Sequence, residues 1–297
     1  KEDPLKVVEY KLANGLTVYL NEDHNLSKVF GAVIVKGGAK CDPEGHPGIA
    51  HYFEHIMFKG TDEIGTTNYK TEKVYLDSIS VLYDKLGETK DELERKALQS
   101  EINRISLKAA DYAIPNEMDK VLEGMGSTGV NAFTSKDAIV YHNSFPGNQV
   151  EKWIEVYSHR FMHPVYRLFQ SELETVYEEK NMYMDNPFSR MIELFEGNLY
   201  KGHPYGNSII GEVDNLKNPS LSAMDNFFQT YYVANNMGLL LTGDFNTEDV
   251  IPLIEAKFGR WRSGEVPPMP EYKEEPIVGK IVISERLTPV KIGLLGF

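Results

Sequence analysis

Residues 48–60 read Gly-Ile-Ala-His-Tyr-Phe-Glu-His-Ile-Met-Phe-Lys-Gly, and this stretch holds the strongest pattern in the chain. Apolar side chains recur in it at helical spacing, so we expect a helix that ends just before Gly60. His51 and His55 are four residues apart and therefore share one face of that helix, with Glu54 at its edge. The spacing predicts that both imidazoles bind one metal ion and that Glu54 acts on a nearby water molecule.

A third metal ligand is expected on a separate element, because a catalytic zinc ion takes three protein ligands and keeps one open position. The acidic segment 171–180 is the obvious source. Glu172 and Glu179 within it are seven residues apart and would share one helix face. One carboxylate could bind the metal while the other orients a histidine. Spacing alone does not decide between them, and an ordinary exposed acidic helix fits the same pattern.

Outward from the motif, strands and helices come in mixed groups rather than in strict alternation. Residues 6–12 and 16–21 flank Asn14-Gly15, which predicts a hairpin. These mixed groups favour an α+β fold with an antiparallel-rich sheet packed by helices. We expect further strands over 29–36, 130–133, 138–145 and 237–242, and helices over about 148–162, 167–186, 188–200, 221–231 and 248–258.

Two segments interrupt this pattern. Residues 70–122 are rich in Glu, Lys, Leu and Ala, and we expect a largely solvated helical insertion in which Gly87 separates two helices. Residues 263–276 hold four prolines and are expected to form a linker. We therefore expect a catalytic domain over 1–262, followed by a strand pair over 277–297 that begins a second, truncated domain.

The composition excludes some classes of protein. The chain of 297 residues has a net charge of −13 and no basic stripe, which argues against nucleic-acid binding. The single cysteine rules out an internal disulfide, and no apolar run is long enough to span a membrane. The chain starts without Met, so a bacterial exported (periplasmic) protein and a cytoplasmic one both remain possible.

The motif stretch resembles the active-site segment of the pitrilysin/insulinase metallopeptidases, which carry the inverted His-x-x-Glu-His arrangement. That family includes insulin-degrading enzyme and the mitochondrial processing peptidase. The resemblance covers roughly residues 5–262, in order. The matching segments are Gly48–Thr61, Asn131–Ser135, Glu172 with Glu179, His203–Gly206, Gly243–Phe245 and Lys257–Gly259.

The resemblance implies a processing-peptidase-like domain that works as a zinc-dependent endopeptidase. One zinc ion per chain would be held by His51, His55 and Glu179, with Glu172 as a supporting acidic residue. Glu54 would be the general base that activates water.

The resemblance also implies how a peptide substrate binds. Asn131, Ala132, Phe133 and Thr134 match the edge strand on which an extended peptide docks as an added strand. Phe58 and Phe133 match apolar positions near the scissile bond, although plain core packing explains them equally well.

Two departures from the family pattern concern the rest of the chain. The interval from His55 to Glu179 is longer than usual, and the helices over 70–122 account for the excess. Family enzymes have two similar halves that close around the peptide, whereas here only 277–297 could represent the second half. A second homologous domain or subunit is therefore expected. Three alternatives stay open: a subunit of a two-chain peptidase that is inactive without its partner or missing half, a binding module with structural zinc, and a zinc hydrolase of small molecules.

Overall fold

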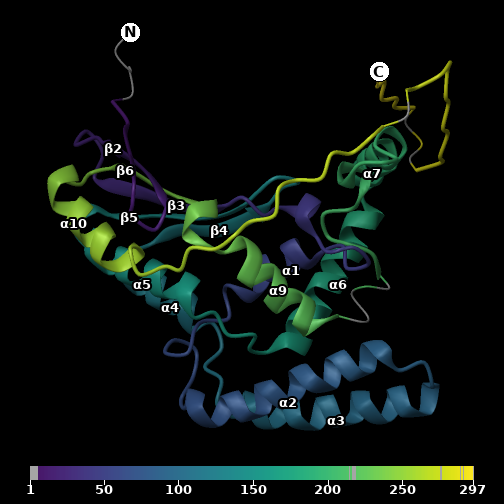
Figure 1. Ribbon diagram of the computed structural model, residues 1–297, viewed down its shortest axis with the longest axis horizontal. Helices are drawn as coiled ribbons and strands as arrows, with labels where there is room; N and C mark the ends of the chain where they lie inside the picture. Colours follow the sequence, from purple (N-terminus) through teal and green to yellow (C-terminus); the bar gives the residue numbers. More distant parts are fainter. Residues whose placement is uncertain are drawn as a thin grey trace.

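The fold is organised around one six-stranded sheet (Figure 1). The computed structural model describes residues 6–213, 215, 219–274, 276–287, 289 and 291–296. Residues 1–5, 214 and 216–218 of the expected catalytic domain, 275 of the expected linker, and 288, 290 and 297 of the expected second domain lie outside the described residues. The strands are Val8–Lys11 (β1), Thr17–Glu22 (β2), Lys28–Val35 (β3), Thr128–Thr134 (β4), Ile139–Pro146 (β5) and Met237–Gly243 (β6).

The sheet has the spatial order β1-β2-β6-β3-β5-β4. Among the described strands, four of the five neighbouring pairs are antiparallel, and β2 with β6 is parallel. The predicted hairpin joins β1 to β2, and Gly15 at its turn has φ 92°, a left-handed conformation that glycine adopts without steric cost. The predicted α+β fold with an antiparallel-rich sheet is confirmed.

Helices cover one face of this sheet. The α-helices are Ile49–Ile56 (α1), Tyr69–Glu88 (α2), Glu92–Ala110 (α3), Glu117–Gly124 (α4), Val150–Met162 (α5), Phe169–Asp185 (α6), Pro187–Leu199 (α7), Leu221–Tyr231 (α9) and Thr247–Phe258 (α10). Short 3₁₀ turns are Ala39–Cys41, Gly147–Gln149, Pro204–Gly206 and Ala234–Asn236. Buried and half-buried residues alternate along β5 and β6, as expected for a sheet with one covered face. In Figure 1, α4, α5 and α10 run beneath the sheet. None of the helices in the described residues is both long and apolar enough to cross a membrane.

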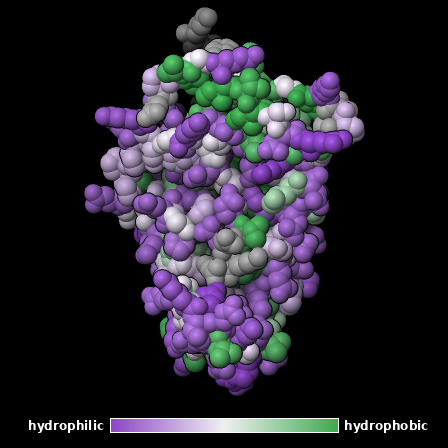
Figure 2. Space-filling model, turned by 90° about the vertical axis from the view of Figure 1, so that its right-hand side faces the viewer, coloured by the Kyte–Doolittle hydropathy of each residue, from purple (hydrophilic) through white to green (hydrophobic). Residues whose placement is uncertain are grey.

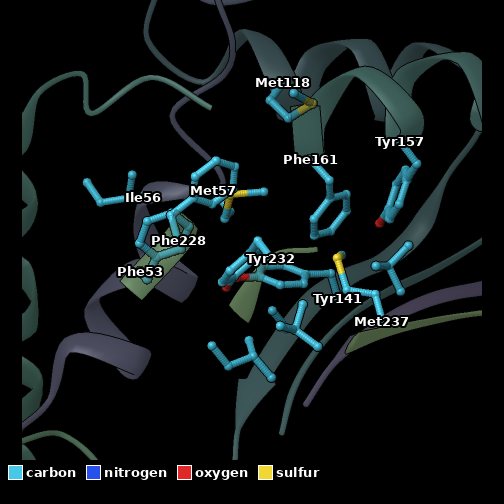
Figure 3. Packing of buried hydrophobic residues seen from close by; sticks show 14 of the residues in the cluster. Phe53, Ile56, Met57, Met118, Tyr141, Tyr157, Phe161, Phe228, Tyr232 and Met237 are labelled. Atoms are coloured by element: carbon cyan, nitrogen blue, oxygen red, sulfur yellow. The ribbon is translucent and has the colours of Figure 1, made fainter. Parts of the chain in front are cut away.

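Aromatic side chains anchor α1 in the core (Figure 3). Phe53 stacks on Phe228 of α9 with 5.5 Å between ring centroids and lies 4.8 Å from the ring of Tyr232. The Tyr232 hydroxyl is in turn 2.7 Å from that of Tyr141 on β5. Since these rings are buried, they fix the position of α1 relative to the sheet. The histidines of α1 face α6 instead.

The paired helices α2 and α3 project from the body of the molecule (Figure 1). The predicted break between two helices is present, but it falls at residues 89–91, and Gly87 is the penultimate residue of α2. The stronger signal is Asp91, whose side chain caps α3 by accepting a 2.8 Å hydrogen bond from the backbone N–H of Glu94.

The C-terminal segment runs over the surface without joining the sheet. Asn235 and Gly264 exchange two hydrogen bonds of 2.9 Å, and the backbone N–H of Gly202 donates to Glu274 at 3.2 Å. The strand pair expected over 277–297 is wrong for the described part of that range, which forms no strand. A lone hairpin is marginally stable in water, and this segment instead lies against α7. Figure 2 shows hydrophobic side chains gathered at this end of the molecule.

Candidate active site

The start of α1 is fixed by a carboxylate from the preceding loop. Asp42 accepts hydrogen bonds from the backbone N–H of Gly48 at 2.7 Å and of Ala50 at 2.8 Å. These N–H groups have no partner within the helix. A negative charge there also interacts favourably with the positive end of the helix dipole. Burial raises the pKa of Asp42 to about 7, although the two N–H donors act in the opposite direction. The sequence analysis gave Asp42 no role.

Three possible metal ligands converge between α1 and α6. Glu179 on α6 places Oε1 3.7 Å from His51 Nε2 and Oε2 3.3 Å from His55 Nε2. One ligand atom from each of the three side chains lies within 4.8 Å of the others. Two imidazole nitrogens and one carboxylate oxygen form a donor set used by catalytic zinc sites. The residues present therefore fit the metal that the motif predicts.

His51 is held in the form that binds metals. Its Nδ1 is buried without a hydrogen-bond partner among the described residues, and its Nε2 lies beyond hydrogen-bonding distance of Glu179. Burial, and to a smaller extent the neighbouring His55, lower the pKa of His51 to about 4. The ring is therefore neutral at pH 7, with a lone pair available for a metal ion.

The orientation of His55 is set by Glu172. Glu172 Oε1 lies 2.8 Å from His55 Nδ1, and Lys59 contacts the other carboxylate oxygen. Since an ionised carboxylate can only accept, Nδ1 donates and Nε2 faces Glu179. Burial disfavours protonation of His55, but the hydrogen bonds to Glu172 and Glu179 outweigh it and raise the pKa of His55 to about 9. Spacing did not decide which of the two glutamates binds the metal. In the structure Glu179 lies near Nε2 of both histidines, whereas Glu172 contacts only Nδ1 of His55.

Glu54 faces the same space and is held by the sheet. Thr134, at the end of β4, donates a 2.5 Å hydrogen bond to Glu54 Oε2. Burial raises the pKa of Glu54, while the bond from Thr134 and the charge of His55 oppose that rise. A carboxylate with a raised pKa is suited to accepting a proton near neutral pH. The resemblance placed Thr134 in the substrate-docking strand but predicted no contact with Glu54, although Thr134 lies two residues beyond Ala132 and so shares its strand face.

A pocket of about 270 Å³ opens onto His51, Glu54 and Glu179. Its other lining residues come from β4, from α6 and α7, and from the loops that follow β4 and α7; they are Ala132, Phe133, Thr134, Lys136, Tyr183, Ile192, Glu193, Glu196 and Gly206–Ile210. Among the described strands β4 pairs with β5 alone, so its outer edge is free beside this pocket.

Two predicted substrate residues do not line this pocket. Asn131 is exposed on β4 and does not line the pocket. Phe58 lies beyond the end of α1, where the guanidinium of Arg160 stacks 4.4 Å from its ring centroid. Arg160 Nε also donates a 2.9 Å hydrogen bond to the Met57 carbonyl. The contacts of Phe58 are therefore those of a packing residue at the end of the motif helix.

Arg167 links the elements that carry the site residues. Its buried guanidinium binds both carboxylate oxygens of Glu72 on α2, at 2.5 and 2.8 Å. It also donates to the carbonyls of Lys59 and Thr61, in the loop that follows α1. Because Arg167 stands two residues before α6, it connects the histidine helix to the helix that carries Glu179.

Two protein-family models match this chain. Residues 17–74 and 89–213 match the family model described as Insulinase (Peptidase family M16), and residues 220–295 match the one described as Peptidase M16 inactive domain.

Similar proteins include several proteases. Zinc protease PqqE of Helicobacter pylori is 25% identical over 202 residues, which are 67% of this chain and 45% of that protein. Insulin-degrading enzyme of Mus musculus is 24% identical over 284 residues, which are 93% of this chain and 23% of that enzyme. The crystal structure of pitrilysin aligns with a TM-score of 0.67 at 19% identity, over 92% of this chain and 24% of that chain. The chain thus spans less than half the length of these three proteins. Because the M16 model matches residues 17–74 and 89–213, more than half of the chain, the chain belongs to the insulinase family of peptidases, family M16.

Proposed function

We propose that this chain is the catalytic part of a zinc-dependent endopeptidase. The observation that carries the proposal is the convergence of His51, His55 and Glu179, two of which, His51 and Glu179, line one pocket together with Glu54. The names of the relatives, among them a zinc protease, support the same reaction class. One zinc ion bound by the two histidines and Glu179 would polarise a peptide carbonyl and lower the pKa of a water molecule.

In this proposal the remaining steps belong to the side chains around the pocket. Glu54 takes a proton from the attacking water and later delivers it to the leaving amine. The hydroxyl of Thr134 holds the Glu54 carboxylate in place for both transfers. Glu172 keeps His55 Nε2 turned toward the ligand site through its bond to Nδ1.

The free edge of β4 is the proposed binding site for an extended peptide. An added strand would pair with the backbone beside Asn131, Ala132 and Phe133, whose N–H and C=O groups give affinity without sequence preference. The Phe133 side chain is 51% exposed and can contact a substrate side chain directly. A small-molecule substrate would leave this edge unused.

A second homologous domain or subunit is proposed to close the pocket. The Glu179 side chain is 43% exposed, so this site is half-open to solvent. The matched part of this chain makes up 45% of PqqE and 23% of insulin-degrading enzyme, which leaves room in both relatives for a second half. The alternative is that this chain belongs to a two-chain peptidase and is inactive without its partner.

The experiment compares Glu54→Gln with the parent chain, measuring zinc content and hydrolysis of a series of peptides of increasing length. Loss of the base should reduce turnover by about 10²–10⁴-fold while zinc stays bound. Glu248→Gln, an exposed substitution on α10, is the matched control. Near-normal turnover of Glu54→Gln would reject Glu54 as the base.

Zinc content also separates two kinds of failure. A parent chain that binds zinc, loses it in Glu179→Ala and still shows no hydrolysis needs its partner or second half. A parent chain that binds no zinc at any site contradicts the proposal itself.

A further inference from the structure

A buried lysine stands next to the proposed ligand Glu179. Lys180 is the last member of the buried stripe on α6, after Glu172 and Val176, and its side chain is only 2% exposed. The four residues of α6 that follow Asn181 are all exposed. The Glu179 side chain is itself 43% exposed, so packing around it does not fix its position. Within the C-terminal half of α6, the anchor nearest to Glu179 is therefore Lys180.

The ammonium group of Lys180 binds two residues that line the pocket. Nζ donates a 2.8 Å hydrogen bond to Glu193 Oε1 on α7 and a 3.0 Å hydrogen bond to Ser208 Oγ, in the segment that follows α7. Glu193 and Ser208 both face the space that Glu54 and Glu179 share. A charged donor between two acceptors favours one position, whereas an apolar side chain tolerates small shifts.

The position of the Glu179 carboxylate depends on how α6 is held. Glu172 attaches the helix to His55, but it lies two turns, about 10 Å along the axis, before Glu179. A tilt of about 10° about Glu172 would therefore move Glu179 by roughly 2 Å. Zinc–ligand distances vary by only about 0.2 Å. A second attachment close to Glu179 is needed to keep it in place, and Lys180 supplies it.

We infer that Lys180 is a positioning residue for the metal site, because its contacts with Glu193 and Ser208 hold α6 where Glu179 reaches both histidines. The inference rests on the proposed function, since it takes Glu179 as a zinc ligand. Adjacent side chains on a helix point about 100° apart around its axis. Lys180 therefore faces α7 while Glu179 faces α1, and it acts on the ligand through the helix that both share.

A neighbouring arginine allows Lys180 to be removed without leaving a buried charge unpaired. Arg190 Nη1 donates a 3.0 Å hydrogen bond to Glu193 Oε2, the other oxygen of that carboxylate. Glu193 therefore keeps a cationic partner in Lys180→Met, and this variant is expected to fold. What the variant loses is the attachment of α6 beside Glu179.

The test measures zinc affinity by competition with a chromogenic chelator and, separately, the unfolding free energy of the metal-free chain. Lys180→Met should bind zinc about 10–100-fold more weakly than the parent, the range typical of residues that orient a ligand. Lys180→Arg, which keeps a donor within reach of Glu193, should recover most of that affinity. Lys73→Met removes an exposed lysine from its ion pair with Asp77 on α2 and should bind zinc as the parent does.

The double variant Lys180→Met/Glu193→Leu separates positioning from stability. Replacing a buried ion pair by apolar side chains is often neutral for stability, so the metal-free double variant should unfold with the free energy of the parent. Its zinc affinity should stay as low as that of Lys180→Met, because no ion pair then fixes α6. Recovery of zinc affinity together with stability would overturn the inference. This comparison holds even if Lys180→Met alone does not fold.

The outcomes also distinguish this inference from the proposed function. A parent that loses zinc in Glu179→Ala but binds it equally well in Lys180→Met contradicts the inference alone. A parent that binds no zinc contradicts the proposed metal site, and this inference with it.

Discussion

Glu172 shows at the scale of single residues how a carboxylate can serve a metal site without touching the pocket. Its two oxygens are taken by His55 and Lys59, both on or just after the motif helix. It therefore fixes which nitrogen of His55 remains available. The position of Glu172 explains why two glutamates seven residues apart on one helix can have different roles.

Replacing Glu172 by Gln tests that role. We expect zinc affinity to fall by about 10–100-fold, as is typical when the partner of a ligating histidine is lost. Competition with a chromogenic chelator measures the affinity. Glu174→Gln, an exposed change on the same helix, is the control. Equal affinities of Glu172→Gln and the parent would show that Glu172 does not orient the ligand.

Asp42 leads to a prediction about pH. Its folded-state pKa of about 7 lies above its ordinary value of 3.8 because the carboxyl is buried. The folded chain therefore holds this proton more tightly than the unfolded chain does. The resulting contribution to stability is complete below the ordinary pKa and is lost as the pH rises through about 7.

Asp42→Asn keeps a side-chain oxygen but cannot ionise, so it isolates this effect. Between about pH 5 and pH 8 the parent should lose unfolding free energy relative to Asp42→Asn. Denaturant unfolding of both proteins at each pH measures the difference. A parent that gains stability relative to the variant over this range would contradict the assignment.

At the scale of elements, the buried pair of Arg167 and Glu72 controls how α2 and α6 meet the loop after α1. Breaking a buried ion pair by removing one partner typically costs 3–5 kcal/mol, because the remaining charge stays buried. We expect Glu72→Gln to lower the unfolding free energy by about that amount. Lys73→Gln, an exposed neighbour on α2, should change it by less than about 0.5 kcal/mol. Equal stability of the two variants would show that the pair does not connect these elements.

Much of the element order is readable from the sequence because its signals are local. The hairpin at Asn14-Gly15, the motif helix and the strand pair β4–β5 each follow from a turn signal or a periodicity within about ten residues. The prediction at Gly87 places the break two residues early, because the cap at Asp91, and not the glycine, marks where the next helix begins.

The site residues could be predicted only in part, because some of their contacts join residues that are far apart in the sequence. His51, Glu54 and His55 lie in one motif, and a family resemblance adds Glu179. Arg167 meets Glu72 across 95 positions and Thr134 meets Glu54 across 80, so neither contact leaves a spacing in the sequence. Such partners become visible once the topology brings their elements together. The roles of the predicted site residues remain proposals until the variants above are measured.

At the scale of the whole molecule, the described part of the C-terminal segment adds no strand to the sheet. It presents exposed apolar side chains instead. The side chains of Val278, Val282 and Leu295 are 85%, 70% and 87% exposed. Surface of this kind favours association with another molecule or domain. We expect a chain truncated after Pro276 to keep its stability to within about 0.5 kcal/mol and to self-associate less than the parent.

Unfolding curves and sedimentation velocity measure these two outcomes. Truncation after Arg262 provides the contrast, because it also removes the anchors at Gly264 and Glu274 and should lower stability. If the chain ending at Pro276 fails to unfold cooperatively, the segment beyond it belongs to the fold after all.

The place of β6 in the sheet has a consequence for how the protein is made. β6 lies between β2 and β3 and pairs with both, yet its residues 237–243 are synthesised more than 200 positions after those of β2. Translation at about 5–20 residues per second would need roughly 10–45 s to cover that interval. During that time the motif helix and its acidic partners exist as nascent chain beside a sheet that cannot yet close. The ribosome thus releases β6 only after every proposed metal ligand, so the proposed metal centre cannot assemble on a closed sheet until β6 has been made.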